Sequence, residues 1–136
     1  GTGVTGMGVV GKPISIEEVV RGIGVPFVRV IDPLKVKEAI RAIREALAFE
    51  GPAVIISRSP CALQETMRKT QCGETITPYE VDPSLCQGCR VCTDKLGCAA
   101  AIWEGEQASI DAALCTGCGV CAQICPYKAI HKVKGQ

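Results

Sequence analysis

The stretch that decides the fold is a double run of cysteines. The first run is Cys86-x2-Cys89-x2-Cys92-x5-Cys98, and the second is Cys115-x2-Cys118-x2-Cys121-x3-Cys125-Pro126. Three cysteines at three-residue steps allow one tight loop to present three thiolates to the same face of an inorganic core. This spacing is typical of a short chain that wraps two [4Fe–4S] clusters, and it predicts an electron-carrying module.

Each cluster needs a fourth thiolate, which in two-cluster ferredoxins comes from the other run. Cluster one is therefore expected to take Cys86, Cys89, Cys92 and Cys125, and cluster two Cys115, Cys118, Cys121 and Cys98. The first run is the less regular of the two. Its last spacing is five residues instead of three, and Ala99 stands where Pro126 follows the second run.

Two other uses of cysteine remain open at this point. Pairs of the form C-x2-C also build zinc sites, although a third cysteine one step further on is surplus to a four-ligand zinc ion. A disulfide framework fits less well, because the cysteines crowd into the last third of the chain at short steps. Cys61 and Cys72 lie outside both runs and are expected to be unreactive thiols, since no histidine flanks them.

An internal repeat surrounds the cysteines. Val81-Asp82-Pro83-Ser84-Leu85 precedes the first run and Ile110-Asp111-Ala112-Ala113-Leu114 the second, so each residue stands 29 positions after its counterpart, as Cys115 does after Cys86. The repeat predicts an α+β ferredoxin-like (βαβ)2 domain over residues 79–136, with the clusters as much of its core.

Residues 1–57 have a different pattern. Ser15-Ile16-Glu17-Glu18 is a capping box, which predicts a helix ending near Gly24. Phe27–Ile31 and Ala53–Ser57 are apolar, β-branched runs that predict strands. Between them, Asp32-Pro33 predicts the start of a second helix, whose apolar face carries Val36, Ile40, Ile43 and Leu47 and which ends near Glu50.

This strand–helix–strand order predicts a parallel βαβ unit, which is too small to be a complete domain. Two parallel strands leave open edges and an uncovered face, so we expect residues 1–57 to be part of a larger α/β fold. Residues 58–78 are predicted to be a linker, with one or two helical turns over residues 62–69.

The 136 residues carry 15 basic and 14 acidic side chains, and this balance does not favour nucleic-acid binding. No apolar stretch approaches the roughly 20 residues of a membrane span. Cysteines arranged for cluster ligation favour a reducing cytoplasm.

Taken together, these segments make the whole chain resemble the C-terminal portion of the alpha subunit of indolepyruvate:ferredoxin oxidoreductase. The resemblance rests on Gly1-Thr2-Gly3, on Phe27-Val28-Arg29-Val30-Ile31-Asp32-Pro33, on Glu50-Gly51-Pro52-Ala53-Val54-Ile55-Ile56, on Arg58-Ser59-Pro60-Cys61-Ala62-Leu63 and on Cys115-Thr116-Gly117-Cys118-Gly119-Val120-Cys121. It implies the end of a thiamine-diphosphate domain followed by a two-cluster ferredoxin domain.

In that family, thiamine diphosphate and magnesium support the oxidative decarboxylation of aryl pyruvates to acyl-CoA. Electrons leave singly through iron–sulfur clusters to an external ferredoxin, and a beta subunit completes the enzyme. The family's Gly-Asp-Gly motif and downstream Asn are not in this chain. We therefore expect no catalytic residue here and no activity from the chain alone. A free-standing ferredoxin carrier and a zinc-binding interaction module are the alternative functions.

Overall fold

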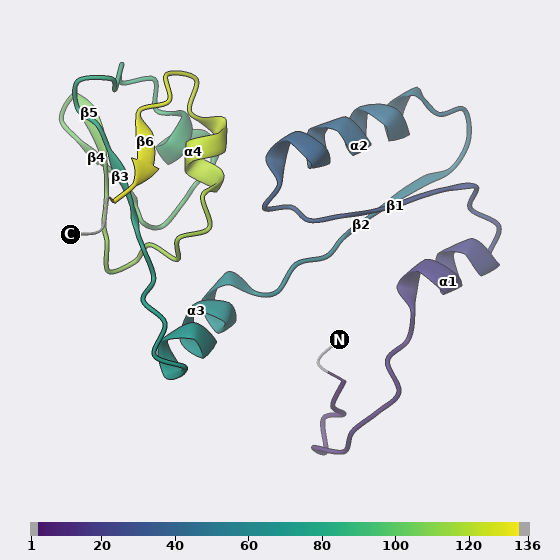
Figure 1. Ribbon diagram of the computed structural model, residues 1–136. Coiled ribbons are helices and arrows are strands. Elements are labelled where there is room, and N and C mark those ends of the chain that lie inside the picture. The colour runs from purple at the N-terminus through teal and green to yellow at the C-terminus, as the bar shows by residue number, and fades with distance from the viewer. Residues whose placement is uncertain (1–2, 134–136) are drawn as a thin grey trace. The chain divides into compact units, whose positions relative to one another are not determined.

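The computed structural model describes residues 3–133, which divide into two compact units (Figure 1). One unit comprises the chain up to Asp32 together with Glu38–Arg58. The other comprises Pro33–Lys37 and the chain from Ser59 onward. The boundaries at residues 57 and 78, given above from sequence, remain predictions.

The first unit begins with a capped helix, α1 (Ile16–Gly22). The side-chain oxygen of Ser15 accepts a hydrogen bond from the Glu18 amide at 3.2 Å, as the capping box predicts. The chain leaves the helix at Gly24, which adopts a positive φ of 89°. A glycine takes this left-handed conformation without the steric cost that a side chain brings.

The sheet of the first unit consists of two parallel strands, β1 (Phe27–Ile31) and β2 (Ala53–Ser57). Phe27 pairs with Ala53 and Ile31 with Ser57, so both predicted strands and their parallel direction are confirmed. Figure 1 shows α1 and α2 on opposite sides of this strand pair.

The second helix, α2 (Val36–Ala48), differs from the prediction at both ends. It begins three residues after Pro33, because Pro33 and Leu34 form a turn instead of the first helical turn. It ends before Glu50, and Gly51 then turns the chain with a φ of 134°.

The apolar stripe of α2 is only partly covered. Ala42 is the buried residue of the helix, whereas Ile40, Ile43 and Leu47 are 45%, 45% and 81% exposed. A sheet of two strands is too narrow to bury the whole apolar face of a helix of this length.

From Ser59 onward, the second unit contains α3 (Ala62–Gln71) followed by six short segments. These are β3 (Tyr79–Val81), the π-helical turn η1 (Val91–Lys95), β4 (Ala101–Glu104), β5 (Gln107–Ile110), α4 (Val120–Ile124) and β6 (Ile130–Lys132), with the cysteine loops between them. The order strand, helical turn, strand thus occurs twice.

Two antiparallel ladders hold these segments together. β3 pairs with β6, and β4 pairs with β5. The repeat is visible in the hydrogen bonds, because the Asp82 amide donates to the Ala129 carbonyl at 2.7 Å and the Asp111 amide to the Ala100 carbonyl at 2.8 Å. Asp82 and Asp111, like Ala100 and Ala129, are 29 positions apart. Each half of the repeat therefore closes onto the other half.

Candidate metal centre

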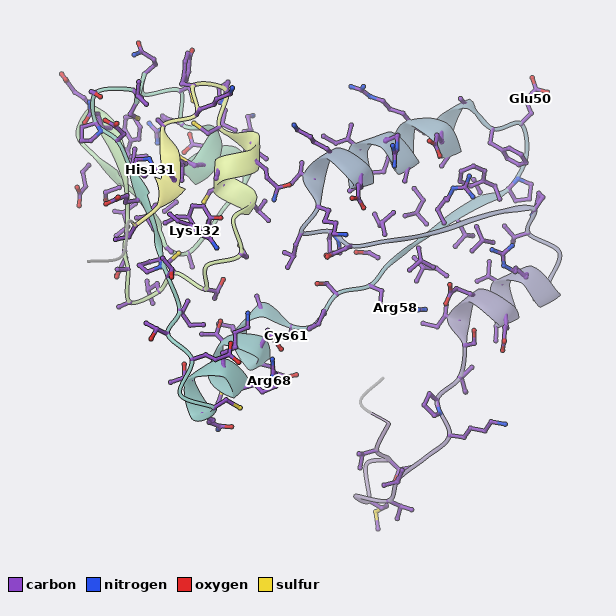
Figure 2. The ribbon with its side chains drawn as sticks, in the orientation of Figure 1. Glu50, Arg58, Cys61, Arg68, His131 and Lys132 are labelled. Atoms are coloured by element: carbon purple, nitrogen blue, oxygen red, sulfur yellow. The ribbon has the colours of Figure 1, made fainter. Side chains whose placement is uncertain are left out.

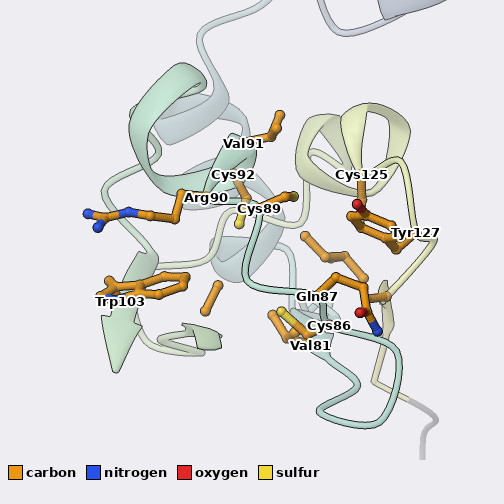
Figure 3. A pocket seen from close by; sticks show the side chains of 13 residues that line it. Val81, Cys86, Gln87, Cys89, Arg90, Val91, Cys92, Trp103, Cys125 and Tyr127 are labelled. Carbon is orange, nitrogen blue, oxygen red and sulfur yellow. The ribbon is translucent and has the colours of Figure 1, made fainter. Parts of the chain in front are cut away.

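Four cysteines line a first cavity in the second unit. Cys86 and Cys89 reach it from the loop between β3 and η1, Cys92 from η1 itself, and Cys125 from the end of α4 (Figure 3). The other lining residues are mostly apolar and include Val81, Trp103 and Ile130.

Four further cysteines line a second cavity. Cys115, Cys118 and Cys121 belong to the loop before α4 and to its first turn, and Cys98 follows η1. The structure thus brings to each cavity three cysteines of one run and the last cysteine of the other. These are the two sets of four that the spacing predicts as ligand sets.

Glycines at matching places allow both loops to turn tightly against the backbone. Gly88 has a φ of 63°, and a Cβ there would lie 2.9 Å from the carbonyl oxygen of Glu106. Gly117 has a φ of 69°, and its Cβ would lie 3.1 Å from the carbonyl oxygen of Thr77. The two glycines are 29 positions apart, and the two residues whose carbonyls they approach, Thr77 and Glu106, are also 29 positions apart. The two loops are therefore built on the same backbone plan.

The two residues added in the first run are accommodated by a wider helical turn. After Cys121 the chain follows an α-turn, in which the Cys125 amide donates to the Cys121 carbonyl at 3.1 Å. In η1 the Leu96 amide donates to the Val91 carbonyl at 3.0 Å, five residues back, as in a π-helix. This wider turn explains how a spacing of five residues still delivers Cys98 to the second cavity.

Arg90 stands at the place that Gly119 occupies in the second run. Both residues are left-handed, with φ values of 59° and 73°. The left-handed conformation costs free energy for a residue other than glycine, and the Arg90 side chain makes two contacts that offset this cost. Its guanidinium lies 4.8 Å from the centre of the Trp103 ring and 3.0 Å from the Asp94 carboxylate. Figure 3 shows Arg90 extended beside Trp103 at the edge of the first cavity.

Tyr79 occupies the wall of the second cavity. Its backbone amide donates a hydrogen bond to the sulfur of Cys115 at 3.4 Å. Its hydroxyl oxygen lies 2.6 Å from where a Cβ of residue 119 would be, so only a glycine leaves room for it. Burial raises the pKa of the Tyr79 hydroxyl, and negative charge on Cys121, Cys118 and Cys115 raises it further.

The thiols differ in how far they are buried. Burial is the main cause that raises the pKa of Cys121 to about 11, and burial also raises the pKa of Cys92. The second cysteine of each run, Cys89 in the first and Cys118 in the second, is exposed. A buried thiolate is costly unless a metal compensates its charge, so the sulfurs and their apolar walls suit a site in which every sulfur is bound to metal.

The donor set therefore fits an iron–sulfur cluster. Each cavity offers four sulfurs and an apolar surround, and none of the ten cysteines is in a disulfide. Within residues 3–133 no three His, Cys, Asp or Glu side chains converge as ligands of a single ion. A cubane takes one thiolate on each of its four irons, so its ligands need not meet at one point.

Three candidate residues named from the sequence, Cys61, Cys72 and His131, are not among the residues that line either cavity. Cys61 and Cys72 are exposed at the two ends of α3, and His131 of β6 pairs with Glu80 at 3.3 Å (Figure 2). The sequence reasoning missed Tyr79 and Leu63, which both line the second cavity. Leu63 belongs to α3, in the stretch predicted to be a linker; the segment that ends at Leu63 carries the resemblance, but nothing in it predicts a cavity residue.

Comparison with known proteins identifies the second cysteine run. A family model for 4Fe-4S binding domains matches residues 108–131, which contain β5, the second run and the start of β6. This match supports 4Fe–4S cluster binding by the second run.

Nearly the whole chain is similar to proteins named indolepyruvate oxidoreductase subunit IorA. Those of Pyrococcus horikoshii and Archaeoglobus fulgidus are both 43% identical over 98% of this chain, which corresponds to 21% of each relative. That of Methanothermobacter marburgensis is 39% identical over 96% of this chain and 20% of its own length. The resemblance stated from the sequence is confirmed, and the chain spans about a fifth of the length of these relatives.

Among residues 3–133, no helix combines the length and the apolar character that crossing a bilayer requires.

Proposed function

Because this chain is similar over nearly its whole length to one segment of the indolepyruvate oxidoreductase subunit IorA, we propose that it transfers electrons through two [4Fe–4S] clusters in an enzyme of that type. The observation that carries the proposal is the composition of the two cavities. Each is lined by four cysteines, three from one run and one from the other. A [4Fe–4S] cluster supplies one-electron transfer with little rearrangement of its surroundings.

The ligand sets follow the cavities. The first cluster is held by Cys86, Cys89, Cys92 and Cys125, and the second by Cys115, Cys118, Cys121 and Cys98. The apolar walls keep water away from the buried sulfurs. Cys89 and Cys118 are exposed, so each cluster has one edge near the protein surface, where an electron can enter or leave.

We assign the chemistry that produces the electrons to the rest of a larger enzyme. There, thiamine diphosphate and magnesium would support oxidative decarboxylation of an aryl pyruvate to an acyl-CoA, together with a beta subunit. An external ferredoxin would receive the electrons. The length of the relatives supports this division, since the chain matches about a fifth of them. The uncovered side chains of Ile40, Ile43 and Leu47 also support it, because additional α/β structure would bury them.

The first experiment measures the metal content of the whole chain. Protein purified without oxygen should be brown, absorb broadly near 400 nm, and contain about eight iron and eight sulfide per chain. The matched control is the variant in which Cys61 and Cys72, which lie outside both cavities, are replaced by serine. It should hold the same iron. A colourless wild-type protein containing zinc would refute the proposal.

The second experiment separates part of an enzyme from a free-standing carrier. The chain is mixed with the remaining part of an IorA-type subunit, and binding is measured by size-exclusion chromatography. Replacing Leu47 by glutamate should weaken the association, whereas replacing the exposed Lys37 on the same helix should not. A chain that stays monomeric in the mixture while reducing unrelated acceptors would support the carrier instead.

A further inference from the structure

The two cavities differ at one pair of equivalent positions. Tyr79 begins β3, and Ala108, which stands 29 positions later, lies at the corresponding place in β5. The structure supports this equivalence. Gly88 and Gly117 are 29 positions apart, and so are Glu106 and Thr77, the residues whose carbonyls they approach. Tyr79 lines the second cavity and Ala108 the first.

Tyr79 brings two hydrogen-bond donors to the second cavity. Its amide already donates to the sulfur of Cys115 at 3.4 Å. Its hydroxyl reaches the loop at Gly119, between Cys118 and Cys121, where the missing side chain makes room for it. A tyrosine hydroxyl carries its proton at neutral pH and can therefore donate.

Ala108 brings neither donor to the first cavity. It is buried, and its methyl group cannot donate. Backbone amides of the helical turn bond to the sulfur of Cys92 in the first cavity, as the Ala122 amide does to Cys121 in the second, so these donors are common to both. Tyr127 also lines the first cavity, but it is 48% exposed, so its hydroxyl is available to water. The nearest cation is Arg90, whose charge is balanced by Asp94 at 3.0 Å and whose side chain is 50% exposed. Water and the carboxylate therefore screen much of its effect on the first cavity.

Donors aimed at a cluster's sulfurs stabilise the reduced state more than the oxidised state, because reduction adds one negative charge to the site. We propose that Tyr79 raises the reduction potential of the second cluster above that of the first, so that the second cluster accepts the first electron. This inference rests on the proposed function, because it requires that both clusters are present. One electron is added to the cluster, and Tyr79 keeps its proton throughout.

The test is a redox titration of the 136-residue protein with its clusters, followed by electron paramagnetic resonance. The variant is Tyr79→Phe, which removes only the hydroxyl. The matched control is Tyr127→Phe, which removes a tyrosine hydroxyl from the wall of the first cavity. Iron and sulfide are measured on every sample.

Wild-type protein should show two one-electron steps. Tyr79→Phe should lower the equilibrium constant of the higher-potential step about tenfold, which is ~59 mV for one electron. Tyr127→Phe should leave that step in place. If Tyr79→Phe retains both clusters and the higher-potential step does not move, or only the lower one does, the inference is wrong. A wild-type protein without two clusters would instead refute the proposed function.

Should Tyr79→Phe lose iron, a measurement on the wild-type protein decides. Half-reduced samples prepared in H2O and in D2O are compared by electron–nuclear double resonance. The cluster that is reduced first should couple to an exchangeable proton of the tyrosine hydroxyl. Absence of any such coupling overturns the inference.

Discussion

Replacing Gly88 by alanine is expected to displace the first cysteine loop and release iron. The φ of 63° at this residue is a left-handed conformation, which costs an L-residue about 1–2 kcal/mol. The new Cβ would also lie 2.9 Å from the backbone oxygen of Glu106, so either the cysteine loop or the turn between β4 and β5 must move. Overpacking of this kind costs about 1–3 kcal/mol. The two costs together amount to about 2–5 kcal/mol, a large part of the stability of a small domain.

Gly105 provides the control for the conformational cost. Its φ is 66°, close to that of Gly88, but a Cβ there would meet no atom within 4 Å. Gly105→Ala should therefore cost only the first 1–2 kcal/mol and keep about eight iron per chain. Gly88→Ala should melt at a lower temperature than Gly105→Ala and hold less iron, as measured by iron analysis and by the absorbance near 400 nm during heating. Equal iron content and equal melting temperatures in the two variants would refute the steric reasoning.

Three further predictions follow from the site and from α1. Replacing Cys125 by alanine should reduce iron from about eight to about four atoms or fewer per chain, because this residue leaves its own run to complete the first cavity; an unchanged iron content would contradict the crossed ligand sets. In the cluster-free chain at pH 8, iodoacetamide should label the exposed Cys118 well before Cys121, which is 7% exposed and has a pKa raised to about 11. Because roughly a thousandth of Cys121 is thiolate at that pH, its labelling rate, followed by mass spectrometry, should rise about tenfold per pH unit up to pH 11; a rate independent of pH would count against burial as the cause. Finally, Ser15→Ala removes the hydrogen bond from the Glu18 amide and should cost α1 about 1 kcal/mol, seen as an approximately fivefold faster amide exchange at Glu18; unchanged exchange would show that the cap contributes nothing.

The parts of the structure that could be predicted from sequence are those governed by short-range chemistry. Ser15 caps α1 because its side chain needs to reach only three residues ahead. The β-branched runs at Phe27 and Ala53 form strands because their side chains favour extended backbone. The cysteine runs bring three sulfurs together because the loop that carries them is itself only seven residues long.

The parts that could not be predicted depend on packing between distant segments. Asp32-Pro33 is a good helix start locally, yet Pro33 and Leu34 form a turn and α2 begins only at Val36. The stripe of Ile40, Ile43 and Leu47 has helical spacing, but spacing alone does not tell how much of an apolar face the neighbouring structure covers. Tyr79 precedes the first cysteine run and lines the cavity of the second one. Its position follows from the pairing of β3 with β6, which no local pattern reveals.

The internal repeat separates the residues that build a cavity from those that make the two cavities different. Where a backbone carbonyl approaches a cysteine loop, both halves have glycine, at Gly88 and Gly117, because any side chain would collide with it. Where the neighbouring atoms belong to a side chain, the halves differ, as at Tyr79 and Ala108. A side chain can be exchanged without moving the loop, but it changes the donors and the solvent around the sulfurs. The backbone plan therefore accounts for two sites, and the side chains that break the repeat account for any difference in their potentials.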